Sequence, residues 1–171
     1  MKRSPTTLLC LVAALSMWSA SVKCEGTGRI FVSNEMDNTI SVIDGDSYEV
    51  IKIIPVGERP RDMQWHDNKS RLLIATSGSD HIEVLDVETL EIVGFIEAGE
   101  DPELFDLDPS GTILVASNED DNELTVSNVS TGEKIRTVEN VGIEPEGVTF
   151  SNDGKVVFVT SEVTNTVLVV D

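Results

Sequence analysis

The chain has 171 residues, of which 40% are hydrophobic; this content supports a packed core and excludes a disordered protein. Its formal net charge of −19 disfavours nucleic acids and anionic membranes as partners. The same charge suits solubility, cation binding or a basic partner.

Residues 1–21 have the order of a secretory signal peptide. Lys2 and Arg3 give a basic start, residues 8–17 are apolar, and residues 19–21 are small. We therefore expect a periplasmic or secreted protein, with an uncleaved membrane anchor as the alternative, although the apolar stretch is short for a span. Residues 22–28 are expected to form a short tail, in which Cys24 has no partner for an intrachain disulfide; its role stays open.

One segment recurs along the rest of the chain. The string VGERP begins at Val56, AGEDP at Ala98 and VGIEP at Val141, so that their glycines and prolines are 42 and 43 residues apart. A period in this range is typical of stacked repeat units that bury each other's faces.

Each unit contains four short runs rich in Val, Ile, Leu, Phe and Thr, divided by polar turns. In the first unit, residues 30–33, 40–43 and 50–56 have strand length, and residues 34–38 and 44–47 are turns. No stretch has helical periodicity. Alternating apolar residues of the second run are expected to share one face: Ile40, Val42, Ile82, Val84, Leu124, Val126, Val167 and Val169.

Four antiparallel strands in about 40 residues are typical of a β-propeller blade. A β-sandwich is the alternative, but it does not predict a proline loop at this period. We predict an all-β fold, a partial β-propeller of four-stranded antiparallel blades over residues 29–171, with blades at 29–57, 58–99, 100–142 and an incomplete 143–171.

The predicted ring is incomplete. Ordered from the channel outward, the chain begins at a second strand and ends at a third, which gives 14 strands and about three and a half blades. Propellers close with about four to eight blades, and an open array leaves two apolar faces in water. Two copies do not make a regular ring of seven. We therefore expect the N-terminal portion of a longer protein rather than a natural half-propeller.

The units resemble the YVTN family of β-propeller repeats. The matching strings are FVSN from Phe31, SVID from Ser41, and Val56-Gly57 with Pro60; a degenerate PDG turn recurs at residues 108–111 and 151–154. The resemblance covers residues 29–171 and implies a propeller of WD40-like blades.

A narrower likeness concerns the loops DPELF (residues 101–105) and EPEGV (residues 144–148). These strings look like those of periplasmic propellers found alongside pyrroloquinoline-quinone (PQQ)-dependent alcohol catabolism. The likeness implies an exported, non-catalytic binding or assembly module with a periplasmic protein or a small polar metabolite as partner. A propeller enzyme (a lactonase-like hydrolase or a dehydrogenase subunit) and a cell-surface adhesion module are the alternatives.

The loops that lead into the innermost strands should gather at one mouth of the central channel, where ligands commonly bind. Alternatively, proline shapes the turn and the charges are merely solvated. The candidate binding residues are Arg59, Arg61, Asp62, Asp101, Glu103, Glu144 and Glu146.

No other motif identifies chemistry. Residues 34–38 and 118–123 carry oxygen ligands of the type that Ca²⁺ prefers, but without the spacing of a known calcium loop, and such residues also favour tight turns. His66 and His81 have no metal-binding spacing. The sequence lacks haem-attachment, P-loop and GxSxG strings, and the tryptophan-bearing quinone-docking repeat of the dehydrogenases. We predict no cofactor and no catalytic residue, and leave a metal open.

Overall fold

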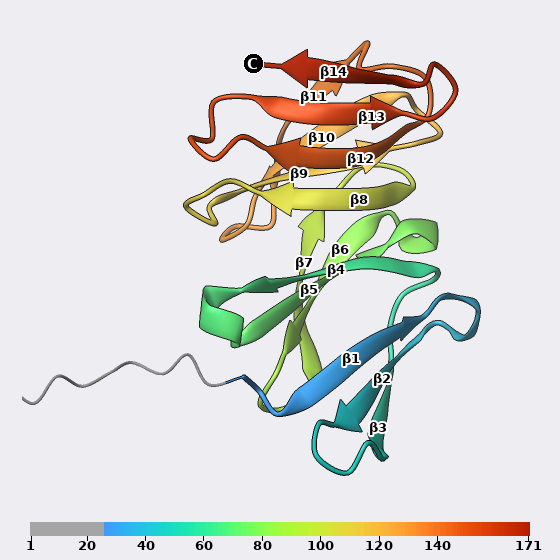
Figure 1. Cartoon of the computed structure of the whole chain (residues 1–171), viewed down its shortest axis with the longest axis vertical. Coiled ribbons are helices and arrows are strands. Elements are labelled where there is room, and N and C mark those ends of the chain that lie inside the picture. Colours follow the sequence, from blue (N-terminus) through green and yellow to red (C-terminus); the bar gives the residue numbers. More distant parts are fainter. Residues whose placement is uncertain (1–25) are drawn as a thin grey trace, which may run out of the picture.

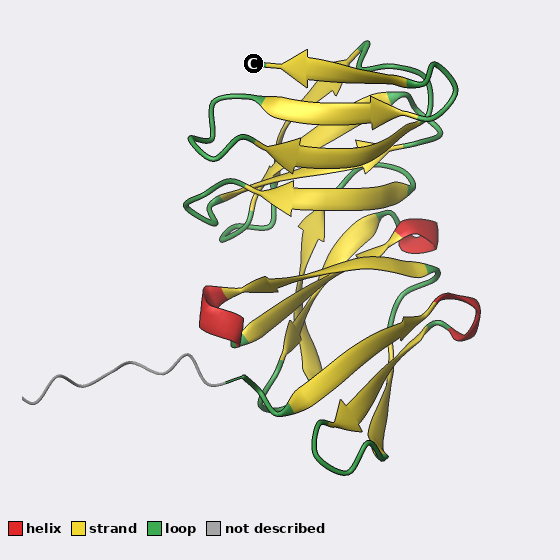
Figure 2. Cartoon of the chain, viewed as in Figure 1, coloured by secondary structure: helices red, strands yellow, loops and turns green. Residues whose placement is uncertain are grey.

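The computed structural model describes residues 26–171, and this part of the chain consists of strands joined by short turns (Figure 2). Three single turns of 3-10 helix interrupt it: η1 (Glu35–Asp37), η2 (Asp67–Lys69) and η3 (Ser77–Ser79). The signal peptide and Cys24 lie outside the described residues. Within them, no helix is long and apolar enough to cross a membrane.

The 14 strands that the sequence predicts are confirmed. In chain order they are β1 (Arg29–Asn34), β2 (Thr39–Asp44), β3 (Val50–Pro55), β4 (Pro60–His66), β5 (Arg71–Thr76), β6 (His81–Asp86), β7 (Glu91–Glu97), β8 (Pro102–Leu107), β9 (Ile113–Asn118), β10 (Glu123–Asn128), β11 (Lys134–Glu139), β12 (Pro145–Phe150), β13 (Val157–Ser161) and β14 (Thr166–Val170).

The strands form four antiparallel sheets (Figure 1). Two sheets have four strands, β4 to β7 and β8 to β11, and two have three, β1 to β3 and β12 to β14. Every sheet is a meander in which strands that are neighbours in sequence also pair. The predicted all-β fold with propeller-like blades is therefore confirmed, and the ring is open.

Consecutive sheets pack face to face, and the strands that follow the prolines are adjacent: β8 contacts both β4 and β12. Between the second and third sheets, Ile82 and Ile96 meet Phe105 and Leu114 in a core from which water is almost fully excluded. Complete burial of one such side chain stabilises the fold by about 1.5–3 kcal/mol. Similar cores lie on both sides of this one.

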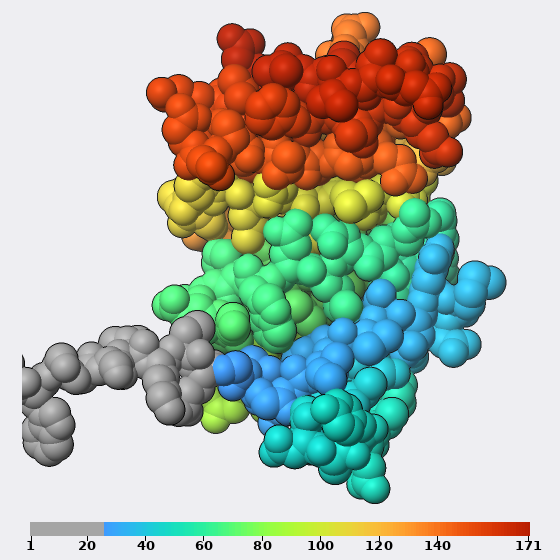
Figure 3. Space-filling model, viewed as in Figure 1, coloured from blue at the N-terminus to red at the C-terminus, as the bar shows by residue number. Residues whose placement is uncertain are grey.

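The alternating face predicted for β2, β6, β10 and β14 is the face that packs on the next sheet. Ile40 and Ile82 are completely buried on it. Val167 and Val169 occupy the same positions in the last sheet, but each is 63% exposed because no further sheet covers them. The first and last sheets lie at opposite ends of the molecule (Figure 3), and their outer faces are open.

A glycine recurs in each proline loop because the loop lies against the next sheet. A Cβ atom on Gly57 would lie 2.8 Å from Ser79 Oγ, and one on Gly142 would lie 2.7 Å from Ser161 Cβ. Gly99 also has a positive φ of +78°, and its Cβ would lie 2.6 Å from Asn118 Nδ2. Only glycine fits such positions without strain.

We expect Gly99→Ala to lower the free energy of unfolding by about 1–3 kcal/mol, because it combines a left-handed backbone with a steric clash. Urea unfolding followed by circular dichroism measures the change. Gly94→Ala is the matched control, because its Cβ would find its nearest neighbour at 3.9 Å. Equal effects of the two substitutions would contradict this explanation of the repeat glycine.

Candidate binding site at the channel mouth

The three proline loops share an unusual backbone conformation. The residue before each proline, Arg59, Asp101 or Glu144, lies in the left-handed region, with φ of 53°, 43° and 51°. A residue that precedes proline is normally extended, and non-glycine residues with positive φ are uncommon. Such conformations persist only where surrounding contacts hold them, and they concentrate at functional sites.

A side chain from the preceding sheet holds each of these residues. The backbone N–H of Arg59 donates to Asn38 Oδ1 at 3.0 Å. The N–H of Asp101 donates to Asp80 Oδ1 at 3.1 Å, and that of Glu144 donates to Asn122 Oδ1 at 2.8 Å. The turns at residues 34–38 and 118–123 therefore supply, through Asn38 and Asn122, the acceptors that fix the proline loops.

The mouth also contains three acids, Glu35, Glu119 and Glu162, that were not among the candidate binding residues, although the sequence analysis considered the turns that carry Glu35 and Glu119 for Ca²⁺ ligands. Arg59 and Arg61 form ion pairs with Glu35, at 3.5 and 3.4 Å. Glu119 lies beside Asp101 and Glu103, and it also lies beside Glu144 and Glu162. The signal was present in the sequence, because these acids recur at the repeat period. Glu35 follows β1, Glu119 follows β9 and Glu162 follows β13.

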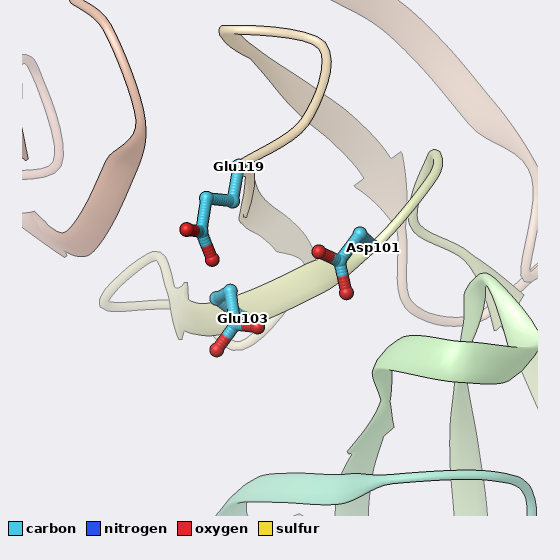
Figure 4. A group of neighbouring side chains, drawn as sticks. All are labelled: Asp101, Glu103 and Glu119. Carbon is cyan, nitrogen blue, oxygen red and sulfur yellow. The ribbon is translucent and has the colours of Figure 1, made fainter.

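Glu103, on β8, is the centre of the site (Figure 4). Its side chain is completely buried, and Arg61 contacts one carboxylate oxygen while Arg59 lies 3.5 Å from the other. Neither oxygen has a donor aligned for a hydrogen bond. Asp101, Glu103 and Glu119 place carboxylate oxygens within 4.8 Å of one another. The arginines therefore neutralise part of a dense acidic group.

Burial controls the protonation of the carboxylates at the mouth. It raises the pKa of Glu103 to about 7, with smaller contributions from Arg61, which lowers it, and from Asp101 and Glu119, which raise it. Burial also raises the pKa of Glu119, and the nearby Glu146 raises it further. The site therefore holds carboxylates that resist ionisation until a cation approaches.

The charge of the mouth is uneven. Both arginines come from the loop and strand that begin the second sheet, where they pair with Glu35, Asp101 and Glu103. A second group of acids, on the side of the last sheet, forms no ion pair with a basic side chain of residues 26–171. We call this group the unpaired acidic cluster; it consists of Glu119, Glu144, Glu146 and Glu162.

Asp62, the remaining predicted binding residue, makes contacts within the fold. Its carboxylate accepts the backbone N–H of Met63 at 2.8 Å and that of Phe105, on the next sheet, at 3.4 Å. Asp106 likewise accepts the N–H of Phe150 at 2.8 Å. Each aspartate thus ties its inner strand to the next one. Asp62 also lines an open pocket of about 370 Å³ at the mouth, together with Glu35, Arg61 and Glu103.

Comparison with known proteins supports the fold. No protein-family model matches the sequence, and no curated protein matches it. The structure is similar to Kuenenia stuttgartiensis hydrazine synthase, with a TM-score of 0.75 and 20% identity over 84% of this chain and 43% of that one. It is also similar to the WD40 β-propeller domain of Doa1, with a TM-score of 0.72 and 18% identity over 85% of this chain and 47% of that one.

These similarities define the class: the chain has a β-propeller fold with WD40-like blades. It spans less than half the length of each of the two structures. Identities of this size show the fold alone.

We expect the Glu103 carboxyl group to make stability depend on pH. Its pKa is raised from 4.5 to about 7 by folding, so its contribution to stability is complete below pH 4.5 and is lost as the pH rises through 7. Glu103→Gln keeps the shape but cannot ionise. Between pH 4.5 and 7, the free energy of unfolding should therefore fall less in the variant than in the wild type.

Urea unfolding at several pH values measures this difference. Glu49→Gln, in the exposed turn between β2 and β3, is the control and should follow the wild-type pH dependence. Parallel pH curves for the wild type and Glu103→Gln would show that this carboxyl group has an ordinary protonation equilibrium.

Proposed function

We propose that this chain is a non-catalytic propeller module that binds a partner through its channel mouth. The partner presents basic side chains, and the unpaired acidic cluster receives them. Small polar metabolites with a cationic group are the second kind of ligand that this chemistry accepts. The single observation that carries the proposal is the presence of four neighbouring carboxylates that form no ion pair with a basic side chain of residues 26–171, beside Glu35, Asp101 and Glu103, which pair with arginines.

The position of the cluster supports this function. Glu144 lies on a loop that is held in one conformation by Asn122, and Glu119 follows the buried strand β9. Burial raises the pKa of Glu119, and the neighbouring acids Glu146, Asp101, Glu144 and Glu162 raise it further. The repulsion among these like charges is an electrostatic cost in the free protein. A basic partner removes that cost, so binding gains both affinity and a faster association rate.

A metal-dependent hydrolase is the second candidate function. The carboxylates of Asp101, Glu103 and Glu119 are close enough to share one ion. A metal at that point would compete with Arg61 for the same carboxylate of Glu103. Metal analysis of the purified protein and a lactone hydrolysis assay distinguish this candidate from the binding module.

We further propose that the module is exported and acts beside PQQ-dependent alcohol oxidation. The support is the order of residues 1–21 and the loops at residues 101–105 and 144–148, which resemble those of the PQQ-associated propellers. Cell fractionation tests the location. Co-purification of a quinoprotein dehydrogenase or transport component from a periplasmic extract tests the association.

We expect the double variant Glu144→Lys/Glu162→Lys to bind a basic peptide at least about tenfold more weakly than the wild type does, because opposite charges replace two acids of the cluster. Calorimetric titration with an oligolysine peptide at low and physiological salt measures the affinity.

The matched control is Glu49→Lys/Glu88→Lys, which changes the net charge by the same amount in two exposed turns away from the mouth. It should retain near wild-type affinity. An equal loss in both double variants would mean that the peptide responds to total charge and that the mouth is not the binding site.

A further inference from the structure

The second sheet departs from the repeat at one buried position. Glu83, on β6, pairs in register with Ile74 and is only 6% exposed. The equivalent residues of the other sheets, taken from the strand registers, are Ser41, Thr125 and Leu168. The fold therefore does not require an ionisable group here, and such departures from a local pattern concentrate at functional positions.

Glu83 holds the loop that leads to the mouth. Its Oε1 accepts the backbone N–H of Gly57 at 3.0 Å, two residues before Arg59. The same oxygen lies 3.7 Å from His81 Nε2, which is longer than a hydrogen bond but within ion-pair range. Glu83 Oε2 and His81 Nε2 are both buried and have no hydrogen-bond partner. Such unpartnered buried groups are uncommon and costly.

In the third sheet, neutral side chains hold the equivalent loop. Thr125 donates to Asn118 Oδ1, and the Asn118 amide donates to the carbonyl oxygens of Ala98 and Glu100 in the equivalent loop. That network does not change with pH in the physiological range. In the second sheet an acid and a base, Glu83 and His81, take the place of this network and lie within ion-pair range of each other.

We propose that His81 and Glu83 form a protonation-dependent latch on residues 56–60. When His81 is protonated, its charge balances the Glu83 carboxylate, which remains a charged acceptor for the Gly57 N–H. When His81 loses its proton, the buried carboxylate loses this cationic neighbour and becomes an uncompensated buried charge. The carboxylate then separates from the loop towards solvent, which breaks the bond to Gly57.

The charged groups around His81 and Glu83 are consistent with a bond to Gly57 that weakens when His81 loses its proton. Burial raises the pKa of Glu83, whereas Gly57 and His81 lower it. The other charged residues near the pair are mostly acidic. Asp80, Glu97, Glu100, Glu133 and Lys134 line the groove beside His81, and Glu58 lies in the latched loop.

Opening of the latch would alter the charges at the mouth through Arg59, which belongs to the loop that the latch holds. This side chain pairs with Glu35, Asp101 and Glu103, so movement of its loop would change the charge that a ligand meets. This consequence depends on the proposed binding function, but the latch itself does not.

Hydrogen exchange of the Gly57 amide, measured by NMR between pH 5.5 and 8, tests the latch without any ligand. After correction for intrinsic exchange, we expect the protection of Gly57 to fall at least about tenfold as His81 titrates. The Glu144 amide is the internal control, because its acceptor, Asn122, does not ionise. The imidazole resonances of His66 and His81 report each titration separately.

Variants that copy the other sheets complete the test. Glu83→Thr copies Thr125, and His81→Thr copies Thr39 and Thr166; both should remove the pH dependence of Gly57 protection. Glu83→Gln, of nearly the same shape, should do so while the fold is retained. Wild-type protection that follows Glu144 at every pH, or pH dependence that persists in His81→Thr or Glu83→Gln, would overturn the latch.

Discussion

The structure depends on the burial of one apolar sheet face against the next. A single repeat sheet cannot bury its apolar faces alone, and here each interior sheet is covered on both sides. This packing brings the proline loops so close to the following sheet that a side chain cannot fit at Gly99. The same approach brings the loop residues of successive sheets to one mouth. Core packing and site geometry therefore have a common cause.

Because the sheets are repeats, the residues at equivalent positions can be compared from sheet to sheet. Positions with the same chemistry in every sheet, such as the loop glycine and the polar acceptor of the next loop, are explained by the architecture. Positions that differ between the sheets are not explained by the architecture, and they are the candidates for a function specific to this protein. The second sheet is the most divergent in this respect, since it alone brings arginines to the mouth and a buried carboxylate beside a histidine.

Much of the fold could be predicted from the sequence, because strand alternation and the proline period are local or regularly spaced signals. The runs 30–33 and 40–43 lie inside β1 and β2, and Ile40 and Ile82 occupy the predicted buried face. The sequence named candidate binding residues, and the fold brings some of them together. Arg61 and Glu103 do meet, but the role of Asp62 depends on a backbone N–H of Phe105 that is distant in sequence. The protonation of Glu103 likewise depends on burial that no sequence pattern reveals.

The aspartate bonds between inner strands have a mechanical consequence. Asp62 and Asp106 connect the inner strands of neighbouring sheets through directional hydrogen bonds. The spacing of the inner strands at that level therefore depends on the length of a carboxylate side chain as well as on the apolar layers further out.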